Sequence, residues 1–203
     1  MEIYEGNKTR GAKSWWRISY KVAAVSIVIL ALAAAGTLVF SSRNKIKNQE
    51  LASLSYSNAI ASLNSEGIKA KINVQAFIDD YSDHYYSILA AMQLARAEIN
   101  ADNPEEGLTQ LRWAQSKAED TVLLSLINLR IARIYKEQGE FEKAKSITET
   151  IDNDGWKGYA LELKGDIELA RGRKEAAYFS YTEAQQERGV SQILQLKLDD
   201  LTG

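Results

Sequence analysis

The side chains with the most obvious chemical potential form one short cluster, made of Asp79, Asp80, Asp83 and His84. Asp80 and His84 are four residues apart and would share a helix face, as metal ligands often do. The sequence contains no second histidine to complete a typical transition-metal site. In the alternative interpretation, which we adopt, Asp83 or Ser82 caps a helix that begins near Tyr85, and these groups are solvated.

Other residues that catalysis would need are scarce. The chain has no cysteine, which removes thiolate nucleophiles and cysteine-based zinc sites, and its single histidine leaves no other base for a Ser–His–Asp triad. The segment Asp152–Gly155 lacks the spacing and the later glutamate of a calcium loop, so it is interpreted as a turn between helices. No glycine-rich phosphate loop is present. The sequence therefore predicts a protein that is not an enzyme and has no cofactor or metal.

An internal repeat organises the second half of the chain. Gly139 and Gly172 lie 33 positions apart, close to the period of about 34 residues in tetratricopeptide repeats (TPRs). Small residues flank each glycine, at Ala132 and Ala144 in the first copy and at Gly165 and Ala177 in the second. A weaker upstream copy has Ala95 and Gly107 at the same separation, with the segment 102–105 in place of the glycine.

This spacing has a direct physical meaning. Small residues let two antiparallel helices approach closely, and glycine ends the first helix because it adopts positive φ without strain. We therefore predict an all-α, TPR-like solenoid with repeat-like units at 88–119, 125–153 and 158–187. Flanking helices are expected at Asn44–Ser65 and Lys69–Tyr81, a terminal cap helix is expected at Gln192–Leu201, and Trp113 and Trp156 are expected to pack between helices.

Equivalent positions on the first helix of each repeat predict a binding face, because TPR arrays usually bind partners on the concave surface that these helices form. The candidate partner-binding residues are Met92, Arg96, Leu129, Arg133, Glu162 and Asp166. Two arginines stacked above an acid, beside apolar residues, could hold an extended or helical peptide. Ordinary surface charge with ion pairs between repeats is the alternative.

A hydrophobic segment near the N-terminus predicts membrane attachment. Residues 22–42 are all uncharged, and the 19 residues Val22–Phe40 would span roughly 28 Å as a helix, close to the bilayer core. The alternative is a signal peptide cleaved after the alanines 33–35, but the apolar run continues beyond them. We predict a single-pass inner-membrane protein with a cytoplasmic tail at 1–21 and a periplasmic domain at 43–203.

Charge supports this orientation and limits the partners. The tail has five basic and two acidic residues, a net charge of +3, whereas 43–203 has 20 basic and 25 acidic residues, a net charge of −5. A basic N-terminal flank favours the cytoplasmic side. An acidic solenoid is a poor binder of nucleic acid, so none is expected as a partner.

The whole chain resembles the YfgM family. The resemblance rests on the opening MEIYE, the basic tail, the single hydrophobic segment, the turn at Gly155 and Trp156, the LKGD of 163–166 and the closing LKLDDL of 196–201. It implies an ancillary subunit of the SecYEG translocon that cooperates with a PpiD-like membrane-anchored chaperone and meets unfolded secretory proteins. It also implies, as an alternative, a regulatory role in which the tail binds a cytoplasmic response regulator.

Overall fold

The computed structural model describes residues 22, 25, 26, 37, 40 and 47–202. The predicted tail at 1–21 and most of the predicted membrane helix at 22–42 therefore lie outside the described residues. Among the residues that are described, no helix is both long and apolar enough to cross a bilayer. The chain divides into two compact units, Met1–Leu51 and Ala52–Gly203, and the second contains the repeats.

Helices provide all the regular secondary structure in the described part of the chain, which confirms the all-α prediction. A helix over 47–66 corresponds to the predicted helix Asn44–Ser65. The elements that follow it are η1 (Gly67–Ala70), α2 (Lys71–Asp80), α3 (Tyr85–Asn100), α4 (Pro104–Lys117), α5 (Thr121–Glu137), α6 (Phe141–Thr148), α7 (Asp154–Ala170), α8 (Lys174–Arg188) and α9 (Gln192–Thr202).

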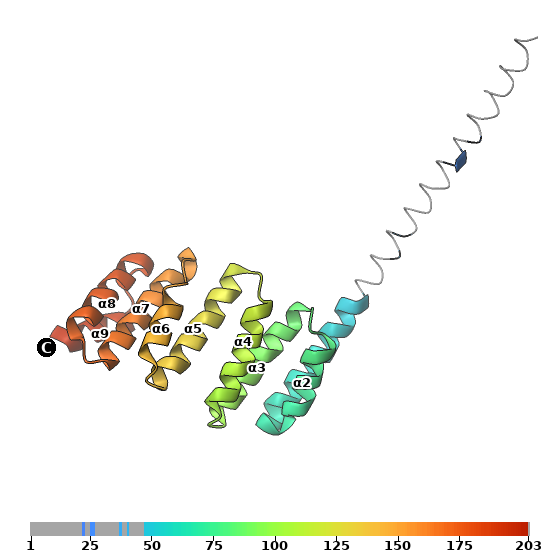
Figure 1. Cartoon of the computed structure of the whole chain (residues 1–203), viewed down its shortest axis with the longest axis horizontal. Helices are drawn as coiled ribbons and strands as arrows, with labels where there is room; N and C mark the ends of the chain where they lie inside the picture. The colour runs from blue at the N-terminus through green and yellow to red at the C-terminus, as the bar shows by residue number, and fades with distance from the viewer. Residues whose placement is uncertain (1–21, 23–24, 27–36, 38–39, 41–46, 203) are drawn as a thin grey trace, which may run out of the picture. The chain divides into compact units, whose positions relative to one another are not determined.

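Within the second unit the helices pack as pairs. Contacts join α3 to α4, α5 to α6, and α7 to α8, and each pair overlaps with one of the units 88–119, 125–153 and 158–187. Successive pairs also pack, through α4 on α5 and α6 on α7, and Figure 1 shows them following one another in chain order. Because a single pair cannot bury its apolar stripe, this stacking produces the hydrophobic core.

Small residues lie where the two helices of a pair cross, as the sequence predicts. Ala132, Ala144 and Ala177 are fully buried, and Gly165 of α7 faces the ring of Tyr181 on α8. A Cβ atom added to Gly107 would lie 3.0 Å from the carbonyl oxygen of Ala95. The helices of each pair therefore approach too closely for larger side chains at these positions.

The turns within the three pairs share one geometry. Gly139 and Gly172 have φ values of 75° and 76°, and Asp102 takes the same left-handed conformation with φ 64°. After each turn a backbone N–H bonds to the carbonyl five residues earlier, as from Arg173 to Glu168 at 2.9 Å. This bond is typical of a helix that ends at a left-handed residue, and it explains the repeated glycine.

Replacing Gly172 with alanine should lower the free energy of unfolding by about 1 kcal/mol, because a Cβ atom strains the left-handed backbone. Thermal unfolding followed by circular dichroism should show a melting temperature lower by roughly 2–4 °C. Gly172→Asn is the matched control, since asparagine tolerates this conformation and should cost less. Equal losses for both variants would contradict the strain argument.

Two buried glutamates each connect the first helix of a pair to the helix that precedes it. Glu98 is 1% exposed, lies 2.7 Å from the ammonium of Lys71 on α2, and accepts a hydrogen bond from the Asn103 amide at 3.1 Å. This contact raises the pKa of Lys71. Glu168, at the matching place in α7, is contacted by Lys145 of α6 at 3.4 Å and by Arg173 at 3.3 Å. A lysine from the preceding helix thus neutralises each buried carboxylate.

The middle pair uses a tyrosine at the same position. Tyr135 is buried near the end of α5, and Arg112 of α4 donates a hydrogen bond to its hydroxyl. The Arg112 guanidinium also lies 5.7 Å from the centre of the Tyr135 ring, within cation–π range. The first helix of each pair (α3, α5 and α7) is therefore joined near its C-terminal end to the preceding helix by a cation.

Candidate functional site

The acidic cluster does not form a metal site in the described structure. No group of three His, Cys, Asp or Glu side chains among the described residues could hold a metal ion. Asp83 pairs with Lys117 at 3.2 Å, and the ring centre of His84 lies 6.1 Å from that of Tyr81 and 6.4 Å from that of Tyr86. The prediction that Asp83 or Ser82 caps α3 is wrong: His84 occupies the cap position because it is the last extended residue, and no side chain accepts a bond there.

The turn at Asp152–Gly155 and the tryptophans have structural roles. Asn153 caps α7 and accepts a hydrogen bond from the Gly155 N–H at 3.1 Å, so this segment is a helix start. Trp113 and Trp156 are half-buried and pack against the main hydrophobic core, as expected.

The structure places three of the six predicted binding residues on one groove and the other three elsewhere. Met92, Arg96 and Arg133 line a groove between α3 and α5. Leu129 is only 1% exposed and belongs to the core. Glu162 and Asp166 form ion pairs with Lys197 of α9, at 2.8 Å and 2.6 Å. The predicted acids are thus engaged by the chain's own terminal helix.

We call the cavity between α3 and α5 the arginine groove; its volume is about 500 Å³. Met92 from α3, Leu111 from α4 and Ile134 from α5 are buried and give the groove apolar walls. The charged residues lining it include Arg96, Arg130 and Arg133, of which Arg130 is half-buried and the other two are exposed. The groove therefore combines an apolar interior with guanidinium groups at its surface.

The three arginines of the groove are electrostatically unsatisfied. Burial lowers the pKa of Arg130, and the positive charges of Arg96 and Arg133 lower it further. Within the described chain, none of the three forms an ion pair or a hydrogen bond. Glu137, a carboxylate that also lines the groove, is paired with Lys136 at 2.9 Å. The cluster is an unneutralised positive site.

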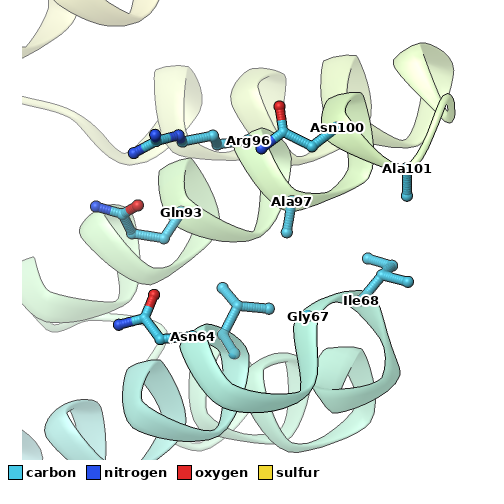
Figure 2. A pocket seen from close by; sticks show the side chains of 9 residues that line it. Asn64, Gly67, Ile68, Gln93, Arg96, Ala97, Asn100 and Ala101 are labelled. Carbon is cyan, nitrogen blue, oxygen red and sulfur yellow. The ribbon is translucent and has the colours of Figure 1, made fainter.

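Two further grooves adjoin the arginine groove on the same first-helix face. One lies between the helix 47–66 and α3, with a volume of about 410 Å³, and Arg96 lines it together with Gln93 and Ala97. Figure 2 shows Gln93 and Ala97 on the side of α3 that faces Asn64 of the earlier helix. The other, lined by Tyr56, Tyr85, Leu89, Leu126, Arg130 and Trp156 among others, is largely aromatic and aliphatic.

Arg130 is the one arginine of the cluster that the repeat pattern does not predict. Its equivalents in the other two copies are Gln93 and Leu163, which do not suggest a charged surface. Its three-residue spacing from Arg133 on one helix is the signal that could have identified it, because residues three apart are neighbours on a helix surface.

Paired helices that stack through small residues and left-handed turns define a TPR-like solenoid with grooves between its first helices. A family model described as a tetratricopeptide repeat-like domain matches residues 13–203. The chain therefore belongs to this family.

Relatives along the whole length share one description. The chain is 26% identical over 207 residues to the ancillary SecYEG translocon subunit of Escherichia coli (strain K12), covering 100% of both proteins. It is 28% identical over 203 residues to the protein so named in Aggregatibacter actinomycetemcomitans, covering 98% of each. These matches confirm the resemblance to the YfgM family.

Solved structures with low sequence identity share the fold. Pseudomonas aeruginosa pilF superposes with a TM-score of 0.60 at 14% identity, covering 75% of this chain and 68% of that one. A kinesin light chain with TPR-like repeats from Podosopora anserina gives a TM-score of 0.51 at 14% identity, covering 73% of this chain and 91% of that one. At this identity the likeness concerns the fold alone.

Proposed function

We propose that this protein is a non-enzymatic, single-pass inner-membrane scaffold at the SecYEG translocon. The observation that carries the proposal is the match along the full chain to proteins named as ancillary subunits of that translocon. The solenoid supplies the kind of repeated, grooved surface on which TPR-like domains bind other proteins. The proposed role is to bind partner proteins near the channel exit.

The proposed topology follows from the sequence. Residues 22–42 anchor the chain, the basic tail at 1–21 stays in the cytoplasm, and the domain at 43–203 lies in the periplasm. In that position the domain cooperates with a PpiD-like membrane-anchored chaperone and meets secreted and outer-membrane proteins. A periplasm-active reporter fused after Gly203 should be active on a membrane-bound, full-length chain.

Co-purification tests the translocon assignment. Full-length protein carrying an affinity tag is purified from membranes solubilised in a mild detergent, and SecYEG subunits are expected among the recovered proteins. An unrelated single-pass membrane protein with the same tag and expression level serves as the control. Recovery of SecYEG at no more than the control level would contradict the proposal.

A deletion tests whether the basic tail carries the contact with the translocon. Removing residues 2–13 takes away three of the five basic residues of the tail and leaves the hydrophobic segment and the repeats unchanged. A translocon scaffold should still recover SecYEG after this deletion. Loss of SecYEG recovery, with the chain still in the membrane, would instead place the contact in the tail.

A further inference from the structure

The arginines of the described chain divide into two groups. Arg171, Arg173 and Arg188 each contact a glutamate, and Arg112 donates to Tyr135. The remaining arginines of residues 47–202 are Arg96, Arg130 and Arg133. All the unpaired arginines of this range therefore line a single groove.

Such an arrangement opposes stability. Three like charges close together repel one another, and half-burial of Arg130 costs hydration energy that no carboxylate of the described chain returns. Elsewhere in the same solenoid, cations placed between helix pairs meet a partner, as Lys71 meets Glu98 and Lys145 meets Glu168. The other four arginines of residues 47–202 all meet a partner, so this local departure among the arginines points to a binding role.

The surroundings of the cluster specify the ligand. Arg96 lines both the arginine groove and the groove beside the helix 47–66, and Arg130 lines both the arginine groove and the largely aromatic and aliphatic groove. The positive charges therefore lie where neighbouring grooves meet. The interior of the arginine groove is apolar, and the groove next to Arg130 contains exposed Tyr85 and Val122. A ligand that fits this surface carries negative charge at its centre and large apolar side chains on either side.

We propose that Arg96, Arg130 and Arg133 form a carboxylate-binding site for a partner-protein segment in which Asp or Glu is flanked by aromatic or aliphatic residues. The proposal rests on the proposed function, because it names the chemistry of the segment that the scaffold binds. Guanidinium groups bind carboxylates by short, charge-assisted and often bidentate hydrogen bonds. The flanking apolar side chains lie in the adjoining grooves.

Charge complementarity favours a peptide over a membrane surface or a nucleic acid. The domain at 43–203 carries a net charge of −5, so an extended polyanion would be repelled by most of its surface. A short segment with one or two carboxylates meets the arginines alone. The size of the arginine groove, about 500 Å³, also suits a few side chains and not a broad surface.

The test compares two fluorescent ten-residue peptides with full-length, detergent-purified protein by fluorescence anisotropy. One peptide has two central glutamates flanked by phenylalanine and leucine, and in the other both glutamates are replaced by glutamine. The glutamate peptide should bind at least tenfold more tightly, and its affinity should fall as salt is added. Equal affinities for the two peptides would overturn the proposal.

Matched variants assign the effect to the arginines. The triple variant Arg96→Gln, Arg130→Gln, Arg133→Gln should weaken binding of the glutamate peptide at least tenfold. The control, Lys69→Gln, Lys164→Gln, Lys174→Gln, removes the same charge from lysines that also have no ion pair in the described chain, and should stay within twofold of the parent. Equal losses in both variants would overturn a specific site.

Thermal stability and lipid binding separate a peptide site from a structural role and from a lipid site. The arginine triple variant should melt at or above the parent temperature, because like-charge repulsion is relieved, whereas a structural role would lower it. Tighter binding to phosphatidylglycerol vesicles than to the glutamate peptide would overturn the peptide assignment in favour of a lipid surface. If the parent chain bound the glutamate peptide but did not co-purify SecYEG, that result would contradict the translocon proposal. The arginine site would still stand.

Discussion

Replacing Gly165 with alanine should lower the free energy of unfolding by about 2 kcal/mol and the melting temperature by roughly 4–8 °C. A Cβ atom at this position would lie 2.4 Å from two ring carbons of Tyr181, well inside van der Waals contact. Alanine is otherwise the better helix former by up to about 1 kcal/mol, so helix propensity cannot account for a net loss of stability.

The Tyr181 ring cannot easily move aside. It is fully buried between α7 and α8, and its hydroxyl donates a hydrogen bond to Asp166 at 2.8 Å. Burial, together with the Asp166 carboxylate, raises the pKa of the Tyr181 phenol well above its usual value. Relief of the clash would therefore require α7 and α8 to separate, which exposes the core between them.

Gly155→Ala is the matched control for the Gly165 variant. Gly155 is exposed near the start of α7, and an added Cβ atom would meet only the Asn153 side-chain oxygen, at 3.3 Å. Its unfolding free energy should remain within about 0.5 kcal/mol of the parent. If Gly165→Ala proved as stable as Gly155→Ala, close approach of α7 and α8 would not explain the repeated spacing of small residues.

Local features of the fold could be predicted because the sequence repeats them. Gly139 and Gly172 occur at a fixed spacing, and each marks a left-handed turn. Small residues at Ala132 and Gly165 likewise mark helix crossings. In both cases the required residue is dictated by backbone geometry, so the reason for the residue is contained in its own neighbourhood.

Contacts between distant residues could not be predicted in the same way. Lys71 meets Glu98, and Lys197 meets Asp166, across turns and different helices. A charged residue in the sequence can face solvent, an ion-pair partner or a ligand, and helical periodicity does not distinguish these. For this reason the candidate site was predicted only in part: Arg96 and Arg133 lie on the groove, whereas Asp166 is bound within the chain.

The terminal helix α9 explains why the first helix of the last pair carries acids that are paired within the chain. Leu194 and Leu198 are buried in a small core with Tyr181 and two alanines of α8. Lys197, between them in sequence, reaches Glu162 and Asp166 on α7. The end of the array is thereby covered by apolar packing and by charge pairing together.

Reversing the charge of Lys197 should break this arrangement. Lys197→Glu would place a third carboxylate beside Glu162 and Asp166, with Arg188 as the remaining cation in contact with Glu162. None of these four side chains is more than 27% exposed, so solvent screens the repulsion only in part. We expect a loss of about 2–3 kcal/mol in unfolding free energy, measured by chemical denaturation.

The loss should be concentrated at the C-terminal end of the chain. Hydrogen exchange of the amides of α9 should accelerate in Lys197→Glu while that of α3 and α5 changes little, because α9 contacts α8 and the side chains of α7. Lys197→Gln, which removes the attraction without adding repulsion, should lie between the parent and Lys197→Glu. The charge-matched control Lys174→Glu changes an exposed lysine with no ion pair in the described chain and should match the parent. Similar exchange in α9 for Lys197→Glu and Lys174→Glu would mean that apolar packing alone holds the terminal helix.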